Sequence, residues 1–438
     1  MKAFDKENNV WSRFSEKERV KMEEYCKNYR FFLDTARTER LAVKEILSQA
    51  ERAGFRSIDS YTKLAAGDKV YWNQKNKAVV LAVIGKEPLE AGAKIVGSHI
   101  DCPRLDLKAA PVFEKDKLVY FKTHYYGGIL KYQWVCQPLS LIGVVCMSNG
   151  RKVDVSIGDG PDDPVFYIND LLPHLGKDQA AKKLNDAIEG EMLMPIIGTH
   201  GEEEKTKPAV LKLFKDKYGI EEEDFASAEL EIIPAQKSRD VGLDRSMIMA
   251  HGHDDRVCSY ANLAGILDAK AGAKTQIALF ADKEEIGSVG NTGVQSSYFL
   301  DFMAELLALQ GKTEELYLRR MLRHSRVLSA DVNAALDPIF ASAYEESNAA
   351  RFGYGICLSK YTGARGKSGS NDANAEFLAE VRRIFNENNV PWQTGELGKV
   401  DQGGGGTIAY IMADWGCEVV DCGVAMLSMH APLELVSK

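Results

Sequence analysis

The sequence predicts an α/β fold with a mostly parallel central sheet flanked by helices, interrupted by a smaller β-rich domain. Strand-like and helix-like segments alternate from about residue 245 onward, which is typical of α/β folds. Short apolar, β-branched runs occur in the first hundred residues, and the pattern of strand-like and helix-like segments changes after them. We therefore expect the main domain at 1–107 and 243–438, with an inserted domain at 108–242.

The first part of the main domain begins with helix formers. Residues 13–53 carry apolar side chains at helical spacing, and Gly54 ends the pattern. The runs at 78–84 and 94–98 are apolar and β-branched, so we expect two buried strands there.

The middle of the chain has a different pattern. The stretches LVYFKTH, LIGVVCM and KVDVSIG alternate as strands do, and stretches at 168–185 and 211–218 are helix-like. The acidic, lysine-rich part at 201–224 predicts an exposed loop and helix. These features predict a separate module inserted into the main fold.

In the last part, the expected strands are SMIMAHG, QIALFA, RVLSAD and CEVVDCGV. Three helices are expected: one begins at Arg256, one covers 297–308 and one covers 372–388. In open α/β sheets, ligands bind outside the carboxyl ends of the strands.

Composition narrows the class of protein. The net charge of −8 disfavours nucleic-acid binding, which needs a basic face. No run approaches the length of a membrane span, and the charged N-terminus has no apolar core of a signal peptide. The eight cysteines form no CxxC pair and are expected to be small buried side chains in a reducing compartment. We expect a cytoplasmic protein without a membrane partner.

Histidine and acidic residues stand where expected strands end or an expected helix begins. They are His99, Asp254, the pair Glu284–Glu285, Asp331 and His430. Each can project into one crevice above the sheet. Alone, a Glu-Glu pair is most often a solvated surface, so only the set indicates a site.

Two imidazoles and several carboxylates without a thiolate suit a pair of zinc-like ions in a catalytic site. A bridging carboxylate would hold two ions that share and acidify one water. Adjacent glutamates diverge near a strand end, so one can bind metal while the other acts as general base. Asp101 can accept the second N–H of the His99 imidazole and fix its tautomer.

Other conspicuous residues have weaker functional interpretations. The glycine run at 402–406 lacks the spacing of a phosphate loop and is better explained by a closely approached backbone beside a pocket. The basic, glycine-rich segment 360–372 is expected to form an exposed loop, a pocket wall or a subunit contact. His251 and His253 flank Gly252 and are alternative ligands or structural residues.

The segments GSHIDCPRLDLK, HDDR followed by SYANL, ADKEEIGSVGNTG, LSADV and SMHAP occur in this order. Together they resemble the aspartyl aminopeptidase and aminopeptidase I family of metallopeptidases, with bacterial members nearest. The resemblance covers essentially the whole chain.

The resemblance implies a role for each matching residue. It implies His99, Asp254 and Asp331 as ligands of one metal ion, and Asp254, Glu285 and His430 as ligands of the other. It further implies Glu284 as general base, a cis bond after Asp254, and His174 reaching a neighbouring subunit's pocket.

The resemblance also implies a metallopeptidase α/β domain interrupted by a dimerisation domain, with two divalent ions per subunit. Zinc is expected, with cobalt and manganese as alternatives. The implied substrates are peptides with a free N-terminus, and the implied assembly is a tetrahedral dodecamer of twelve subunits, built from dimers.

Two acid-recognising positions of the family differ here. Ala334 stands where acid-selective members have His, and Ser368 stands where they have Tyr. Lys360 or Lys367 can still supply a cation for an acidic side chain, so acidic and neutral or hydrophobic preferences both stay open. The chain ends eight residues after His430 (438 − 430), where family members usually continue through a further helix, so a truncated form is one expectation.

The sequence thus predicts a metal-dependent aminopeptidase that hydrolyses the N-terminal residue through a water shared by two ions. The alternatives are a related two-metal deacylase or carboxypeptidase, which activity on blocked N-termini would reveal, and a non-enzymatic oligomeric shell protein.

Overall fold

The computed structural model describes residues 9–201 and 205–438, and these divide into two compact units. The main unit comprises Met1–Asp101, Ser238–Met429 and Glu434–Lys438, and the inserted unit comprises Cys102–Lys237 and His430–Leu433. The expected domain limits at 107 and 242 lie close to these borders, but His430–Leu433 was expected in the main domain.

Two expectations fall partly outside the described residues. Residues 1–8 are part of the charged N-terminus, in which no apolar signal-peptide core was expected. Residues 202–204 belong to the acidic stretch at 201–224.

Within the described residues, the main unit contains a nine-stranded and a five-stranded sheet. The order of the first is β1 (Arg56–Ser57), β2 (Lys69–Gln74), β3 (Ala78–Val83), β14 (Thr275–Ala281), β4 (Ala93–His99), β15 (Arg326–Ala330), β19 (Glu418–Gly423), β17 (Ile356–Ser359), β18 (Trp392–Thr394). The order of the second is β12 (Arg239–Val241), β13 (Met247–Ala250), β21 (Glu434–Ser437), β20 (Ala425–Leu427), β16 (Asn333–Ala334).

The centre of the nine-stranded sheet is parallel. Strand β4 pairs in parallel with β14 and β15, and β15 pairs in parallel with β19. Antiparallel pairs join β3 to β14, β2 to β3 and β17 to β19. The predicted α/β class is confirmed, and the sheet is mixed toward its sides.

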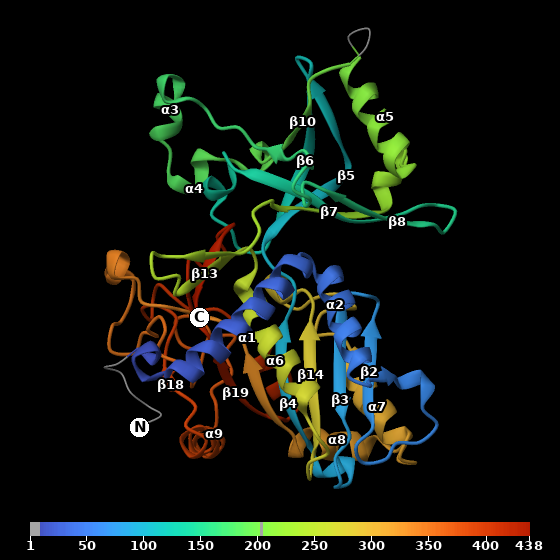
Figure 1. Ribbon diagram of the computed structural model, residues 1–438, viewed down its shortest axis with the longest axis vertical. Helices are drawn as coiled ribbons and strands as arrows, with labels where there is room; N and C mark the ends of the chain where they lie inside the picture. Colours follow the sequence, from blue (N-terminus) through green and yellow to red (C-terminus); the bar gives the residue numbers. More distant parts are fainter. Residues whose placement is uncertain (1–8, 202–204) are drawn as a thin grey trace. The chain divides into compact units, whose positions relative to one another are not determined.

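Both faces of the central strands are covered, which explains their continuous apolar sequence. Alternate residues of β3 enter different cores: Val80 packs with the core around Phe302, and Leu81 packs with the core around Phe32. Figure 1 shows α2 (Glu39–Arg52) and α6 (His253–Asp268) in front of this sheet and α7 (Tyr298–Ala308) and α8 (Glu315–His324) behind it.

The helices of the main unit are α1 (Glu16–Thr35), α2 (Glu39–Arg52), α6 (His253–Asp268), α7 (Tyr298–Ala308), α8 (Glu315–His324), α9 (Ala375–Glu387) and α10 (Ala409–Asp414). The helical stretch expected at 13–53 forms two helices. Thr38 separates them because its hydroxyl accepts a hydrogen bond from the Leu41 N–H and caps α2.

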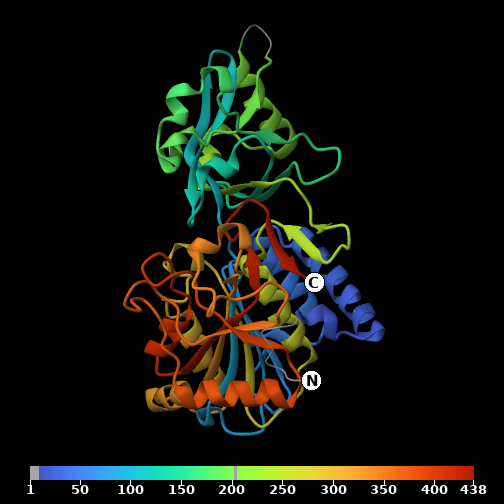
Figure 2. The same cartoon turned by 90° about the vertical axis from the view of Figure 1, so that its left-hand side faces the viewer.

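The inserted unit is built on a seven-stranded sheet within the described residues (Figure 2). Its order is β11 (Ala228–Pro234), β5 (Arg104–Lys115), β6 (Leu118–Tyr126), β10 (Ile196–Gly198), β9 (Phe166–Tyr167), β7 (Pro138–Cys146), β8 (Lys152–Ile157). Strand β11 also pairs with β7, so the sheet curls back on itself. Helix α5 (Thr206–Tyr218) contributes Phe214 to a core that contains Phe121 and Phe225.

The helix-like reading of 168–185 was wrong. This stretch contains only the single-turn helices α3 (Lys177–Ala180) and α4 (Leu184–Ala187) and a short turn around His174. Pro173 and Gly176 interrupt the pattern, because proline lacks the N–H of a helix interior and glycine weakens it.

Cysteine burial largely follows the expectation. All eight cysteines are free; six are buried, Cys146 is half-buried and Cys136 is exposed. Among the described residues, no helix is long and apolar enough to cross a membrane.

The core beneath α7 allows a test of the fold. Phe302 is fully buried and meets Trp72 edge to face at 6.2 Å. We expect Phe302→Ala to lower the free energy of unfolding by about 3–5 kcal/mol, because it leaves a cavity in a packed core. Urea denaturation followed by tryptophan fluorescence measures this loss. Phe31→Ala on α1, where the side chain is 60% exposed, is the control and should change stability by less than about 1 kcal/mol; equal losses would contradict the packing.

Candidate active site

Three parallel strands deliver functional side chains to one edge of the nine-stranded sheet. His99 is the last residue of β4 and is paired with Ala281 at the end of β14. Strand β15 pairs Ser329 with Gly97, so continuing the register by two residues brings Asp331 level with His99. The carboxyl ends of these strands therefore meet at one point.

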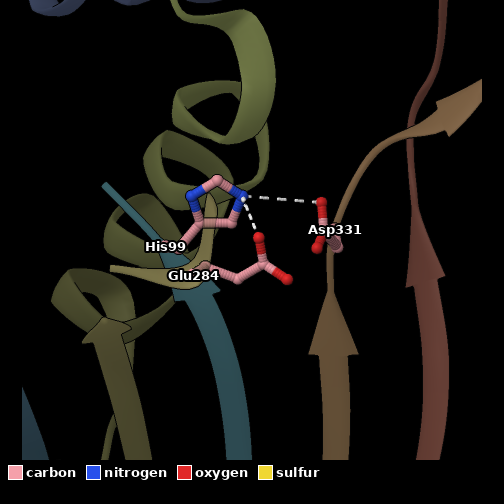
Figure 3. A group of neighbouring side chains, drawn as sticks. All are labelled: His99, Glu284 and Asp331. Carbon is pink, nitrogen blue, oxygen red and sulfur yellow. Dashed lines mark ion pairs between the residues drawn. The ribbon is translucent and has the colours of Figure 1, made fainter. Parts of the chain in front are cut away.

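His99 is buried at the centre of this site. Its Nδ1 lies 3.0 Å from the carbonyl oxygen of Asp101, which can only accept, so Nδ1 carries the proton. Its Nε2 faces three carboxylates: it lies 3.1 Å from Asp254 Oδ1, 3.7 Å from Asp331 Oδ1 and 3.9 Å from Glu284 Oε2. Figure 3 shows the last two contacts converging on the same ring nitrogen.

Asp101 fixes several groups at once. Its Oδ1 lies 3.3 Å from His99 Nδ1, as expected for a residue that orients the imidazole. Its two oxygens also accept hydrogen bonds from the backbone N–H of Glu284, at 3.1 Å, and of Glu285, at 3.3 Å. These backbone contacts were not predicted. They hold the glutamate pair to the segment that follows β4.

The glutamate pair lies in a tight turn after β14. A 3-10 helix spans Glu284–Ile286, and Lys283 before it and Gly287 after it both have left-handed backbones, with φ of 65° and 87°. Such a turn lets successive side chains diverge.

Asp254 lies at the start of α6, where the peptide bond to Asp255 is cis. Its backbone N–H donates to Glu434 Oε2 at 3.1 Å. The Asp255 carboxylate accepts the backbone N–H of His99 at 3.3 Å. Both Asp255 and Glu434 are buried.

The site residues form two overlapping groups of potential metal ligands. One joins His99, Glu284 and Asp331, and the other joins His99, Asp254 and Glu285, with ligand atoms within 4.8 Å of one another in each. The glutamate pair is thus divided between the groups. An imidazole nitrogen with carboxylate oxygens is the donor set of catalytic zinc sites.

Electrostatics in the site favour a bound cation. Burial, together with the neighbouring carboxylates, raises the pKa of Glu284, Glu285 and Asp331 above their usual range. Burial alone would lower the pKa of His99, but hydrogen bonds to Asp101, Asp254 and Asp331 raise it well above its usual value. Crowded buried carboxylates bind protons or cations because like charges repel at low dielectric.

The structure brings together six of the nine residues proposed from the sequence: His99, Asp101, Asp254, Glu284, Glu285 and Asp331. His174 and His430 belong to the inserted unit, where His430 Nδ1 lies 2.8 Å from the carbonyl oxygen of Gly128. Lys360 follows β17 in the main unit and is exposed. Among the described residues, no ion pair joins Lys360 to the site.

The glycine run is explained by close backbone approach. A Cβ added at Gly403 would meet Leu397 O at 1.8 Å, and one added at Gly404 would meet Gly363 O at 1.8 Å. The run therefore packs directly on neighbouring loops, including 360–372.

His251 and His253 are buried and belong to neither ligand group in the described chain. Sequence reasoning missed Glu434 as the partner of the Asp254 N–H, and it assigned Asp255 no contact. For Asp255 the Asp-Asp doublet was an available signal, whereas Glu434 lies 180 residues from its partner.

Comparisons with known proteins agree with this geometry. The model of the family "Aminopeptidase I zinc metalloprotease (M18)" matches residues 32–438. The chain is 48% identical to a probable M18 family aminopeptidase 1 of Clostridium acetobutylicum, over 98% of this chain and 94% of that protein. It is 44% identical to the Borreliella afzelii protein of the same name, over 99% and 96%.

Solved structures give the same result. The M18 aminopeptidase of Thermotoga maritima matches with a TM-score of 0.94 at 44% identity, covering 98% of this chain and 95% of that chain. The S. cerevisiae mApe1 dodecamer matches with a TM-score of 0.75 at 20% identity over 95% and 93%, a likeness of fold alone. The chain belongs to the aminopeptidase I zinc metalloproteases, the M18 family.

Proposed function

We propose that this protein removes N-terminal residues from peptides with two zinc ions per chain. One ion would be held by His99, Asp254 and Asp331, and the other by Asp254, Glu285 and His430, with Asp254 shared. The M18 family supports zinc, and cobalt or manganese would suit the same ligands.

One observation carries the proposal: Nδ1 of His99 is engaged by Asp101, and its Nε2 faces Asp254, Glu284 and Asp331. A lone pair and carboxylate oxygens at 3.1–3.9 Å repel one another unless a proton or cation lies among them. Metal-binding histidines commonly donate their other N–H to a carbonyl or carboxylate, as His99 does to Asp101. The residues therefore fit zinc.

The chain's own residues would handle the proton. Bound zinc would polarise the peptide carbonyl and acidify the attacking water. The Glu284 carboxylate would accept a proton from this water and pass it to the leaving amine. Asp101 would hold the backbone of Glu284 and keep its carboxylate in reach. Buried carboxylates near the ions would bind the substrate's α-amine and so select free N-termini.

Replacement of the proposed base is the first test. We expect Glu284→Gln to lower kcat by about 10²–10⁴-fold, because a positioned general base contributes this much. Turnover of aminoacyl nitroanilides, with zinc content measured on the same preparation, tests the role.

Zinc content separates a base from a ligand, since a Glu284 oxygen lies within ligand range of His99 and Asp331. Two zinc ions per chain should remain in the Glu284→Gln variant. If Glu284→Gln retains wild-type activity, Glu284 is not the general base. If the variant loses zinc, Glu284 is a metal ligand. Wild-type activity on acetylated peptides would instead favour a deacylase.

We propose that neutral N-terminal residues are preferred, because Ala334 and Ser368 supply no charge or ring where the family's acid-selective members have His and Tyr. Lys360 would bind acidic side chains weakly. Lys367 is already engaged, since its Nζ lies 3.0 Å from Asp372 and 4.0 Å from the Tyr361 ring centroid.

Lys360→Met should lower kcat/KM for glutamyl substrates by about fivefold, the value of one exposed ion pair, and leave leucyl substrates unchanged. Lys367→Met is the matched control and should affect neither. The measurement is kcat/KM for the glutamyl and the leucyl nitroanilide with each variant. An equal decrease for both substrates in Lys360→Met would contradict a specific role in binding acidic side chains.

We propose that the inserted unit mediates dimerisation within a tetrahedral dodecamer, and that His174 reaches a neighbouring subunit's pocket. The dodecamer of the S. cerevisiae relative supports this assembly. Leu172 and Leu175 beside His174 are 48% and 66% exposed, and exposed apolar side chains are typical of a surface that binds another subunit. The free cysteines support a reducing, cytoplasmic location.

Leu175→Glu should shift the protein from the dodecamer toward smaller species, because it places a charge in an apolar contact. Analytical ultracentrifugation measures the mass. Leu213→Glu on α5, where the side chain is 67% exposed, is the control within the same unit and should leave the dodecamer intact. A dodecamer that survives Leu175→Glu would place the interface elsewhere.

A further inference from the structure

Helix α1 reaches the residue that precedes Asp254 through a buried hydrogen bond. The Tyr29 hydroxyl lies 2.7 Å from His253 Nδ1, and both side chains are buried. Tyr29 lies before residue 32, where the match to the family model begins.

The partners of His253 determine its tautomer. Its Nε2 lies 3.1 Å from the carbonyl oxygen of Ile248, so Nε2 carries the proton and donates. In the neutral ring, Nδ1 then accepts from the Tyr29 hydroxyl. Both nitrogens are used within the protein, so His253 is a structural residue rather than a metal ligand.

The same region fixes the backbone on the other side of His253. Strand β13, which supplies Ile248, pairs with β21, and Ala250 faces Glu434 in that pairing. Glu434 accepts the Asp254 N–H. The peptide unit that joins His253 to Asp254 is therefore held by the His253 ring and by its own N–H.

Aromatic packing holds α1 in place against α6. The rings of Tyr25, Tyr29 and Phe32 lie 5.1, 5.4 and 5.5 Å from the ring of Tyr260. The Tyr29 hydroxyl is thus presented to His253 by a helix that packs along α6.

We propose that Tyr29 and His253 are positioning residues for the metal site, which set the placement of the Asp254 carboxylate. This inference rests on the proposed function, since it assumes that Asp254 binds zinc. Neither residue touches a reacting atom. They act through the backbone of Asp254.

The test compares zinc binding of the full-length wild type with that of Tyr29→Phe, using competition with a chromophoric chelator well below the melting temperature. Tyr29→Phe removes one hydroxyl and keeps the ring. We expect the zinc dissociation constant to rise by about tenfold, as for other residues that orient a ligand. Tyr25→Phe removes a hydroxyl from the same helix and the same aromatic group, and should bind zinc like the wild type.

A second variant separates the hydrogen bond from general loosening. His253→Leu removes both ring nitrogens and with them the acceptor for Tyr29, so Tyr29→Phe should add nothing to it in the double variant. Wild-type zinc affinity in Tyr29→Phe, even with a lowered melting temperature, would overturn the inference. Equal zinc binding by the wild type and His99→Ala would overturn the proposed function and the inference together.

Discussion

The structure depends on one electrostatic constraint: one buried imidazole nitrogen faces three carboxylates. His99 donates from Nδ1, and its Nε2 is directed at Asp254, Asp331 and Glu284. In water such groups would separate, whereas at low dielectric their repulsion is strong. The fold holds them together, so a cation or protons must compensate their charge. This is the physical basis of a metal-binding function.

The scaffold meets this constraint with backbone donors. The Asp101 carboxylate binds two N–H groups of the glutamate turn, Glu434 binds the N–H of Asp254, and Asp255 binds the N–H of His99. Charge-assisted hydrogen bonds of this kind are stronger than neutral ones. The three carboxylates come from different segments: Asp101 follows β4, Asp255 lies in α6 and Glu434 begins β21. The parallel register of β4, β14 and β15 aligns the strand ends next to His99, the glutamate turn and Asp331.

Sequence patterns predicted the parts of this site that depend on strand ends. The segments that form β3 and β14 are buried on both faces, so their sequences are almost continuously apolar. This composition alone predicted that they are strands. The position of a polar residue just after such a run then predicted His99 and Asp331. Register was not readable, since it depends on pairing between segments more than two hundred residues apart.

Interactions across long sequence separations were missed for the same reason. Nothing in the local sequence around Tyr29 or Glu434 indicates that they reach His253 and Asp254, at separations of 224 and 180 residues. The wrong prediction of a helix at 168–185 has a different cause. It relied on the polar composition of the stretch, whereas Pro173 and Gly176 interrupt helical structure. The ligand role of His430 came from resemblance, and it stays a proposal.

The adjacent glutamates obtain different surroundings from one backbone feature. Both of their N–H groups point at Asp101, so both side chains must leave the turn in other directions. Glu284 then joins Asp331 and His99, whereas Glu285 joins Asp254 and His99. In the proposed site, Glu284 would act on the attacking water, and Glu285, beside the proposed bridging ligand Asp254, would bind a zinc ion. The proposed division into base and ligand therefore follows from where the turn sends each side chain, because the two residues are chemically identical.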